Sequence, residues 1–262
     1  MAKPLLITLL PSFGVDLGRW VLAHYEVDYT ERPHAPIFHV LALKSWGEGK
    51  DNYPLFVHAD GKTKSVGCRK MTEFFDQTAP PDRRLLPEPG TEPELLKQID
   101  DTVQYAFHKV GDGVVNWSYW NFLKDKWLVW PSITTSVPWY EKLTCLLAFR
   151  VIRFLMYKGL GLDQSVADAG LRDIRAAWDR FDALLADGRT YLHGDRLTYA
   201  DLAVASAFAP MILAQGYHGM LPDEARCPVF MQKIYKELRN RPTGLYVQRM
   251  YDTHRPAQLL CV

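Results

Sequence analysis

The chain has 262 residues, of which 48% are hydrophobic and 23% charged, and its formal net charge is +1. This balance is typical of a soluble globular protein with a sizeable core, and the near-zero net charge argues against nucleic acid or an anionic membrane as an electrostatic partner. The sequence lacks the run of about 18 apolar residues that a spanning helix needs, so no membrane insertion is expected.

In chain order, the first part of the sequence alternates between strand and helix patterns. An apolar run between Pro4 and Pro11 predicts a strand buried on both faces, and Asp60-Gly61 predicts a hairpin turn. A strand–helix–strand order implies parallel pairing, and the hairpin adds an antiparallel edge. The expected strands are 5–10, 27–31, 55–58 and 62–66, and the expected helices are 15–25, 34–46 and 69–76.

A proline-rich segment at residues 79–93, APPDRRLLPEPGTEP, marks the best domain boundary in the chain. The sequence therefore predicts an α/β domain at 1–80, a linker at 81–93 and an all-helical domain at 94–262. Beyond the linker, strand patterns fade and helical periodicity dominates. The expected helices are 94–110, 139–158, 164–186, 199–216 and 228–239.

Residues 194–205, GDRLTYADLAVA, contain the clearest local motif of the chain. Thr198 and Asp201 have the spacing of a capping box, in which each side chain accepts a hydrogen bond from the backbone N–H of the other. The apolar, alanine-rich stretch after them predicts a deeply buried helix, whose first N–H groups need partners inside the protein.

The cysteines and histidines give no pattern typical of a metal site. Cys68, Cys145, Cys227 and Cys261 are far apart and form no CxxC or CxxH pair, which argues against structural zinc, a disulfide framework or a dithiol redox motif. The eight histidines are dispersed. No metal is expected, and a reducing, cytoplasmic location is the default.

Taken together, the α/β part, the proline-rich linker and the helical part with its capping box resemble the cytosolic glutathione transferases. Tyr53-Pro54-Leu55 is similar to that family's xPxL segment, whose proline is cis, and residues 71–75 (MTEFF) are similar to its I-x-E-Y-L helix. GDRLTYADLAVA is similar to its G-D-x-x-T-x-A-D capping element and is the most specific of the three. The segment KGLGL at 158–162 also looks like the metaxin-like relatives of this fold, in which transferase activity is doubtful.

The resemblance implies a thioredoxin-like first domain that binds glutathione as co-substrate, a helical second domain, and a homodimer. It implies that Ser12, at the end of the first strand, stabilises the glutathione thiolate by a hydrogen bond; the alternative is that Ser12 only caps the next helix. The glutathione-binding residues implied are Phe13, Lys50, Tyr53, Pro54, Gly67 and Cys68.

One position departs from the family pattern. The family's Glu-Ser or Gln-Ser pair, whose serine binds the γ-glutamyl carboxylate, is replaced by Gly67-Cys68. Cysteine is a poorer hydrogen-bond donor than serine, but Gly67 is expected to offer its backbone N–H to the carboxylate. If the alignment with the family shifts by a few residues, Ser65 is the side-chain donor instead. Cys68 is either a reactive thiol at a helix start or a buried, inert one.

Two apolar regions complete the sequence-based predictions. Of the tryptophan-rich region at 117–140, Trp117 and Trp120 are predicted to line a pocket for a hydrophobic electrophile. The stretch 144–162 is interpreted as a core helix with arginines at one rim, in preference to a membrane-facing amphipathic helix. The favoured function is a glutathione transferase acting in detoxification, by conjugation of an electrophile or reduction of a peroxide. The alternative is a non-catalytic binding or scaffold protein of the same fold.

Overall fold

The computed structural model describes residues 3–217 and 221–255. Its sheet contains β1 (Leu5–Leu9), β2 (Thr30–His34), β3 (Leu55–Val57) and β4 (Lys64–Val66) in the order β2-β1-β3-β4. β1 pairs with β2 in parallel and with β3 antiparallel, and β3 pairs with β4 antiparallel. The predicted mixed sheet is thus confirmed, although β2 begins three residues later than the sequence pattern indicated.

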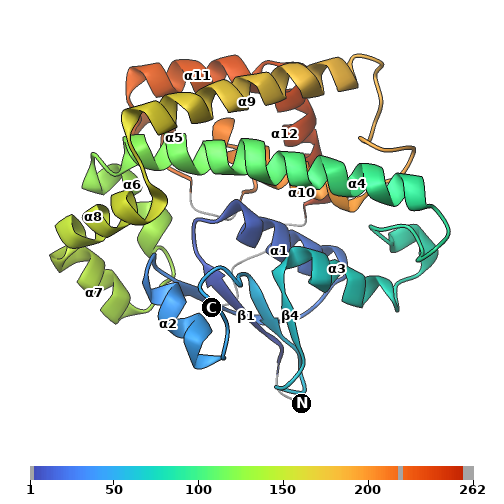
Figure 1. Cartoon of the computed structure of the whole chain (residues 1–262), viewed down its shortest axis with the longest axis horizontal. Coiled ribbons are helices and arrows are strands. Elements are labelled where there is room, and N and C mark those ends of the chain that lie inside the picture. The colour runs from blue at the N-terminus through green and yellow to red at the C-terminus, as the bar shows by residue number, and fades with distance from the viewer. Residues whose placement is uncertain (1–2, 218–220, 256–262) are drawn as a thin grey trace.

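Helices cover both faces of this sheet (Figure 1). α1 (Phe13–His24) and α3 (Gly67–Asp76) pack on one face, where Leu6 and Phe56 join the main core. α2 (Phe38–Ser45) lies over the other face, where Ile7, Leu55 and Val57 form a smaller cluster. Successive strand residues point to opposite faces, which explains why β1 is apolar on both sides apart from Thr8, whose hydroxyl donates to Glu31 at 2.7 Å.

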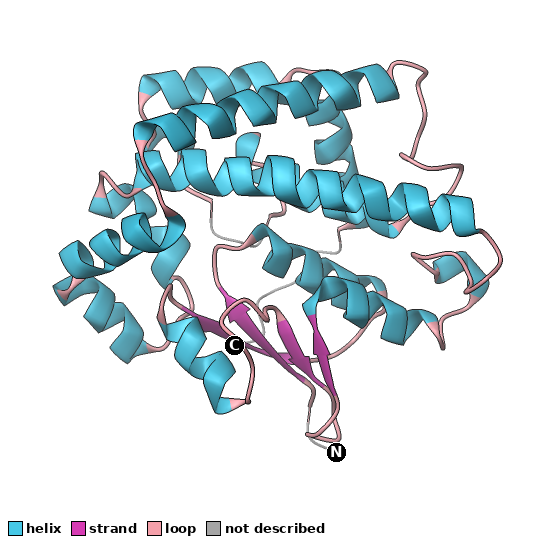
Figure 2. Cartoon of the chain, viewed as in Figure 1, coloured by secondary structure: helices cyan, strands magenta, loops and turns pink. Residues whose placement is uncertain are grey.

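All the described chain beyond β4 is helical or irregular, and its helices stack above the sheet-containing part (Figure 2). The elements in order are α3, η1 (Pro81–Arg83), α4 (Pro93–Tyr105), η2 (Ala106–Gly111), α5 (Asp112–Phe122), α6 (Lys126–Thr134), α7 (Trp139–Leu147), α8 (Phe149–Leu160), α9 (Gln164–Leu185), α10 (Tyr199–Phe208), η3 (Ala209–Met211), η4 (Glu224–Arg226), α11 (Val229–Arg239) and α12 (Pro242–His254).

Several helix boundaries differ from the sequence-based expectation. The helix expected to end at residue 110 continues through the π-helical turn η2 into α5, so α4, η2 and α5 form one long rod. The helix expected over 139–158 is two helices, and the one expected over 199–216 ends at Phe208. α6 and α12 were not predicted at all.

The interpretation of 144–162 as a core helix is wrong. α8 buries Phe149, Ile152 and Met156, but its apolar residues Val151 and Phe154 are 58% and 63% exposed. The reason is that α7 and α8 form a hairpin at the edge of the molecule, covered by the protein on one side only (Figure 1). None of the described helices is both long and apolar enough to cross a bilayer.

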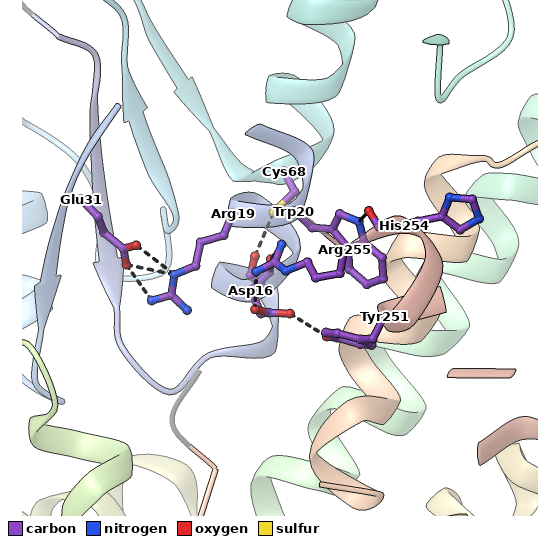
Figure 3. A network of polar contacts seen from close by, with 9 residues as sticks. Asp16, Arg19, Trp20, Glu31, Cys68, Tyr251, His254 and Arg255 are labelled. Atoms are coloured by element: carbon purple, nitrogen blue, oxygen red, sulfur yellow. Dashed lines mark hydrogen bonds and ion pairs between the residues drawn. The ribbon is translucent and has the colours of Figure 1, made fainter. Parts of the chain in front are cut away.

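A buried polar network joins α1 to the end of the chain (Figure 3). Asp16, which is fully buried, accepts hydrogen bonds from the Tyr251 hydroxyl at 2.6 Å and from the Arg255 guanidinium at 2.8 Å. One turn further along α1, Arg19 forms a buried ion pair with Glu31 of β2, with an N–O distance of 2.6 Å. A buried charge without a partner is costly, so these pairs fix α1 both to the sheet and to the helical part.

Candidate functional site

Ser12 lies in the turn between β1 and α1, as the residue that precedes the helix. Its backbone is extended, and its carbonyl accepts hydrogen bonds from the N–H groups of Val15 and Asp16 at 3.0 and 3.1 Å. Its side chain makes no capping hydrogen bond, and its hydroxyl has no hydrogen-bond partner among the residues that the structure describes. The side chain is half-buried. The hydroxyl at the positive end of α1 is therefore available to a ligand.

Phe13, the next residue, connects this turn to the helical rod. Its ring packs edge-on against Phe107, with 5.0 Å between ring centroids. The ring occupies the space beside Gly111 in the π turn, where an added Cβ would lie 2.2 Å from the Phe13 Cζ. A glycine is thus required there, and the contact sets the position of the Ser12 turn against the second domain.

Tyr53 and Pro54 precede β3 and are joined by a cis peptide bond, as the resemblance implied. The backbone N–H and C=O of Tyr53 make no hydrogen bond with any described residue. The Tyr53 ring packs edge-on against His39, and burial raises the pKa of its hydroxyl. Lys50 lies exposed in the loop just before Tyr53.

The start of α3 differs from the expectation. Gly67 has a φ of +77°, which favours glycine, and its N–H donates to the Pro54 carbonyl at 3.0 Å. This N–H is therefore not free for an anion, and the expectation that Gly67 offers it is wrong. The Cys68 thiol is buried and donates to the Gly14 carbonyl at 2.9 Å, and burial raises its pKa. Cys68 thus has the surroundings of an inert thiol.

Ser65 is also engaged within the protein. It lies on β4, is 5% exposed, and its hydroxyl is 2.9 Å from the His58 Nε2. Neither side-chain donor considered for the γ-glutamyl carboxylate is free in this structure. What remains at the start of α3 is the set of backbone N–H groups of its first turn, beginning with Cys68 itself, which have no partner within the helix.

An apolar pocket opens between the two parts of the protein, directly beside Ser12. Its cavity volume is about 50 Å³, within about 500 Å³ of space that includes open solvent. It is lined by Pro11, Phe13, Val114, Val115, Ser118, Tyr119, Phe122, Ser132, Pro210, Tyr217, Leu221 and Pro222. Its wall thus combines the β1–α1 turn, one face of α5, and the segment after α10. Such a concave site between two parts of a protein is the usual place for an apolar ligand.

The two tryptophans predicted for this pocket lie elsewhere. Among the described lining residues neither Trp117 nor Trp120 occurs. Trp117 is buried against Tyr235, and the Trp120 indole donates to Gln164 Oε1 at 3.0 Å. Neither tryptophan lines this pocket because α5 turns a different face, that of Ser118 and its neighbours, toward it.

The pocket wall carries one polar group without a partner. The hydroxyl of Tyr217 is buried and makes no hydrogen bond in the described part of the chain. Burial raises the pKa of this hydroxyl far above its usual range, so it stays protonated and remains a donor. A ligand of the pocket with an acceptor atom would satisfy it.

The capping element behaves as predicted. Thr198 and Asp201 form a capping box at the start of α10, and every residue of α10 is buried. The Asp201 carboxylate accepts the Thr198 N–H at 2.7 Å and also the Leu192 N–H and the Tyr246 hydroxyl, at 2.8 and 2.6 Å. The motif thus supports the fold and lies outside the pocket wall.

No cluster of histidine, cysteine and carboxylate side chains suitable for a metal ion occurs in the described ranges. Cys145 and Cys227 are buried and free. Cys261 lies outside the described residues.

Comparison with known proteins agrees with this geometry. Residues 164–236 match the family model described as the glutathione S-transferase, C-terminal domain. This match runs from the start of α9 into α11, within the helical part of the chain. No curated protein gives a significant match.

Solved structures of glutathione transferases share the fold over nearly the whole chain. A glutathione transferase from Phanerochaete chrysosporium matches with a TM-score of 0.65 and 13% identity, covering 99% of this chain and 100% of its own. A glutathione S-transferase of Ceriporiopsis subvermispora in complex with glutathione matches with a TM-score of 0.64 and 11% identity, covering 98% and 99%. The predicted fold, a thioredoxin-like domain followed by an all-helical domain, is confirmed.

A protein described by another role shares this fold. The GST-like domain of elongation factor 1-gamma from Saccharomyces cerevisiae matches with a TM-score of 0.51 and 14% identity, covering 98% of this chain and 100% of its own. At such identities the likeness establishes the fold, and the activity has to be argued from the site itself.

Proposed function

We propose that this chain binds glutathione at the edge formed by Ser12, Tyr53 and the start of α3, and that it activates the glutathione thiol. The observation that carries the proposal is the Ser12 hydroxyl. It lies at the start of a helix, half-buried and beside an apolar pocket, and has no hydrogen-bond partner among the described residues.

In this function Ser12 acts on the charged form of the thiol. When the glutathione thiol loses its proton to solvent, the Ser12 hydroxyl donates a hydrogen bond to the resulting thiolate, which lowers the thiol pKa. A hydrogen bond to a charged group contributes about 1.5–3 kcal/mol, which corresponds to one or two units of pKa. The thiolate sulfur then forms a bond to an electrophilic carbon, and the leaving group departs from that carbon. With a peroxide, the sulfur attacks one oxygen, the O–O bond breaks and the other oxygen leaves as an alcohol or water after protonation. A second glutathione thiol then reduces the resulting sulfenic acid, giving glutathione disulfide and water.

Backbone groups supply the remaining contacts to glutathione. The N–H and C=O of Tyr53, which make no hydrogen bond with a described residue, are the proposed partners of the ligand's peptide backbone, which would pair as an added strand does. The γ-glutamyl carboxylate then relies on the first-turn N–H groups of α3 and its helix dipole, because the Ser65 and Cys68 side chains are engaged elsewhere. Phe13 and Lys50 remain proposed contacts from the resemblance.

The apolar pocket beside Ser12 is the proposed site of the second substrate. Its wall is mostly aliphatic and aromatic, which suits a hydrophobic electrophile, and Tyr217 offers a hydrogen bond to one acceptor atom on it. A homodimer and a cytoplasmic location stay predictions.

The test is a thermal shift against free glutathione together with turnover of a standard electrophile. Wild-type protein is expected to gain stability at millimolar glutathione by mass action. Ser12→Ala is expected to keep this shift and to lower the conjugation rate near neutral pH by about ten- to a hundredfold, the loss of one charge-assisted hydrogen bond. Ser12→Thr, which keeps a hydroxyl, should recover part of the rate.

Ser45→Ala is the matched control, because the Ser45 hydroxyl is exposed on α2 and donates only to the Ala42 carbonyl. Its rate should equal that of wild type. An undiminished rate in Ser12→Ala would remove Ser12 from its role, and the absence of any thermal shift with glutathione would reject the proposal as a whole.

A non-catalytic binding or scaffold function is the second candidate. It is supported by the engagement of both side chains that were considered for the γ-glutamyl carboxylate, since this leaves the ligand without a side-chain anchor at α3. In that case the protein should unfold cooperatively, with a midpoint that glutathione does not change.

A further inference from the structure

The α7–α8 hairpin exposes an unusual number of large apolar side chains. Most of the exposed large hydrophobic residues in the described chain lie between 126 and 160, and they include Trp139 and Leu147, which are 75% and 78% exposed. Monomeric proteins rarely leave so many large apolar side chains of one hairpin exposed without a partner. We call this surface the α7–α8 face; it is formed by Trp139, Tyr140, Lys142, Leu143, Leu146, Leu147, Arg150, Val151, Phe154, Leu155 and Lys158.

Along α8, apolar and cationic side chains alternate on this face. Arg150, Phe154 and Lys158 are four residues apart and therefore share one side of the helix, with Val151 and Leu155 beside them. The opposite side packs into the protein through its own apolar residues. α8 is thus amphipathic in an uncommon sense, because its outward side carries both aromatic or aliphatic groups and cations.

The charge of this region is strongly one-sided. Residues 126–160 contain five basic side chains and a single acidic one, Glu141. Glu141 is buried and accepts hydrogen bonds from His34 Nδ1 at 2.6 Å and from the Ala35 N–H at 2.8 Å. The exposed carboxylates that normally balance surface cations are absent from this segment, and none of Lys142, Arg150, Arg153 and Lys158 forms an ion pair with a described residue.

The overall net charge of +1 is therefore the sum of two unevenly charged parts of the chain. Segment 126–160 carries an excess of cations, and the rest of the chain is net negative. A total charge near zero does not exclude an anionic membrane as the partner of such a surface, because screening limits charge interactions to about 8–10 Å.

We propose that the α7–α8 face docks on an anionic lipid bilayer, with the hairpin lying in the plane of the interface. Exposed aromatic and aliphatic groups such as Trp139 and Phe154 would enter the boundary between headgroups and acyl chains, where amphipathic rings are favoured. Arg150 and Lys158 would contact lipid phosphates, as juxtamembrane cations do. Such docking needs no spanning helix.

The charge also argues against a second copy of this chain as the occupant. In a two-fold symmetric contact the same patch faces itself, so the cations of one hairpin would meet those of the other without an exposed carboxylate in the segment to pair with. Like charges brought together in this way oppose association, whereas an anionic bilayer complements them.

The proposal does not depend on glutathione. No residue of the α7–α8 face lines the pocket beside Ser12 in the described chain, so variants of the face should keep any conjugation activity. Failure of either proposal therefore leaves the other standing.

The test is flotation of purified protein with vesicles of phosphatidylcholine alone or mixed with phosphatidylglycerol, with tryptophan emission as a second readout. Wild-type protein is expected to float with the mixed vesicles and much less with phosphatidylcholine, and its emission should shift to the blue as Trp139 leaves water. Neutralising both cations, Arg150→Gln with Lys158→Gln, should weaken binding about 30-fold, about fivefold for each charge. Phe154→Glu should weaken it at least as much.

Matched controls lie on other faces. Leu245→Glu changes a side chain that is 61% exposed, close to the 63% of Phe154, and Lys62→Gln removes an exposed cation in the β3–β4 hairpin. Both should bind vesicles as wild type does. Failure to float with anionic vesicles at low salt would overturn the proposal, as would equal loss of binding in the controls. A dimer in solution that Phe154→Glu dissociates, without vesicle binding by the wild type, would assign the face to a second copy instead.

Discussion

Replacement of Asp201 by alanine should destabilise this protein severely, although the residue lies outside the proposed site. The fully buried carboxylate accepts four hydrogen bonds: two from the N–H and hydroxyl of Thr198, one from the Leu192 N–H and one from the Tyr246 hydroxyl, at 2.6–2.8 Å. A buried donor left without an acceptor costs about 1–3 kcal/mol, so three or four of them cost about 4 kcal/mol or more. Domains are stable by only about 5–15 kcal/mol.

Urea unfolding, followed by tryptophan fluorescence, measures this loss as a change in the free energy of unfolding. Tyr246→Phe alone should cost about 1–2 kcal/mol, but much less in the Asp201→Ala background, where the hydroxyl has already lost its acceptor. Asp195→Ala, an exposed aspartate of the same segment, is the control and should change stability by less than about 0.5 kcal/mol. A loss below about 1 kcal/mol in Asp201→Ala, or strict additivity with Tyr246→Phe, would refute the reasoning.

Two further predictions concern titratable groups. Because burial raises the pKa of Cys68, native protein should resist alkylation at this residue near pH 8, whereas urea-unfolded protein should react. Peptide mapping measures the modification. If Cys68 in native protein is modified as fast as a free thiol, its assignment as inert is contradicted. Burial lowers the pKa values of His24, His39 and His193. As the pH falls through about 6.5, the unfolded chain therefore binds more protons than the native protein does. The free energy of unfolding should decrease from about pH 7.5 to about pH 5.5. Urea midpoints that stay constant or rise over this range would show that these histidines are not held neutral.

The sequence carries the local part of this fold well. The apolar run of β1, the hairpin at Asp60-Gly61 and the capping box of Thr198 and Asp201 each depend on a few neighbouring residues, and the structure contains all three. The helical rod was predicted too short, because glycines at 111 and 113 weaken a helix by intrinsic propensity. Gly111 is in fact used by a distant partner, the Phe13 ring, which no local pattern reveals.

The site is harder to predict because its side chains form hydrogen bonds with residues that are distant in sequence. Whether Cys68 is reactive depends on the Gly14 carbonyl, and whether Ser65 is free depends on His58; both partners follow from tertiary packing. Helical spacing places aromatic residues on α5 but does not say which side of the helix faces the pocket. The sequence therefore predicts Trp117 as a lining residue, whereas Tyr119 lines the wall. The exposed face of α8 had the same apolar composition as a core helix, and only its surroundings distinguish the two.

The buried contact between Asp16 and Arg255 joins residues 239 positions apart. During synthesis the sheet and α1 leave the ribosome long before Arg255 is made, so the nascent first domain carries a carboxylate whose cation does not yet exist. The Asp16 carboxylate of α1 can therefore acquire this partner only when Arg255 has been translated. A chain interrupted before Arg255 would hold a complete thioredoxin-like sequence and still lack the cation that pairs with Asp16 of α1.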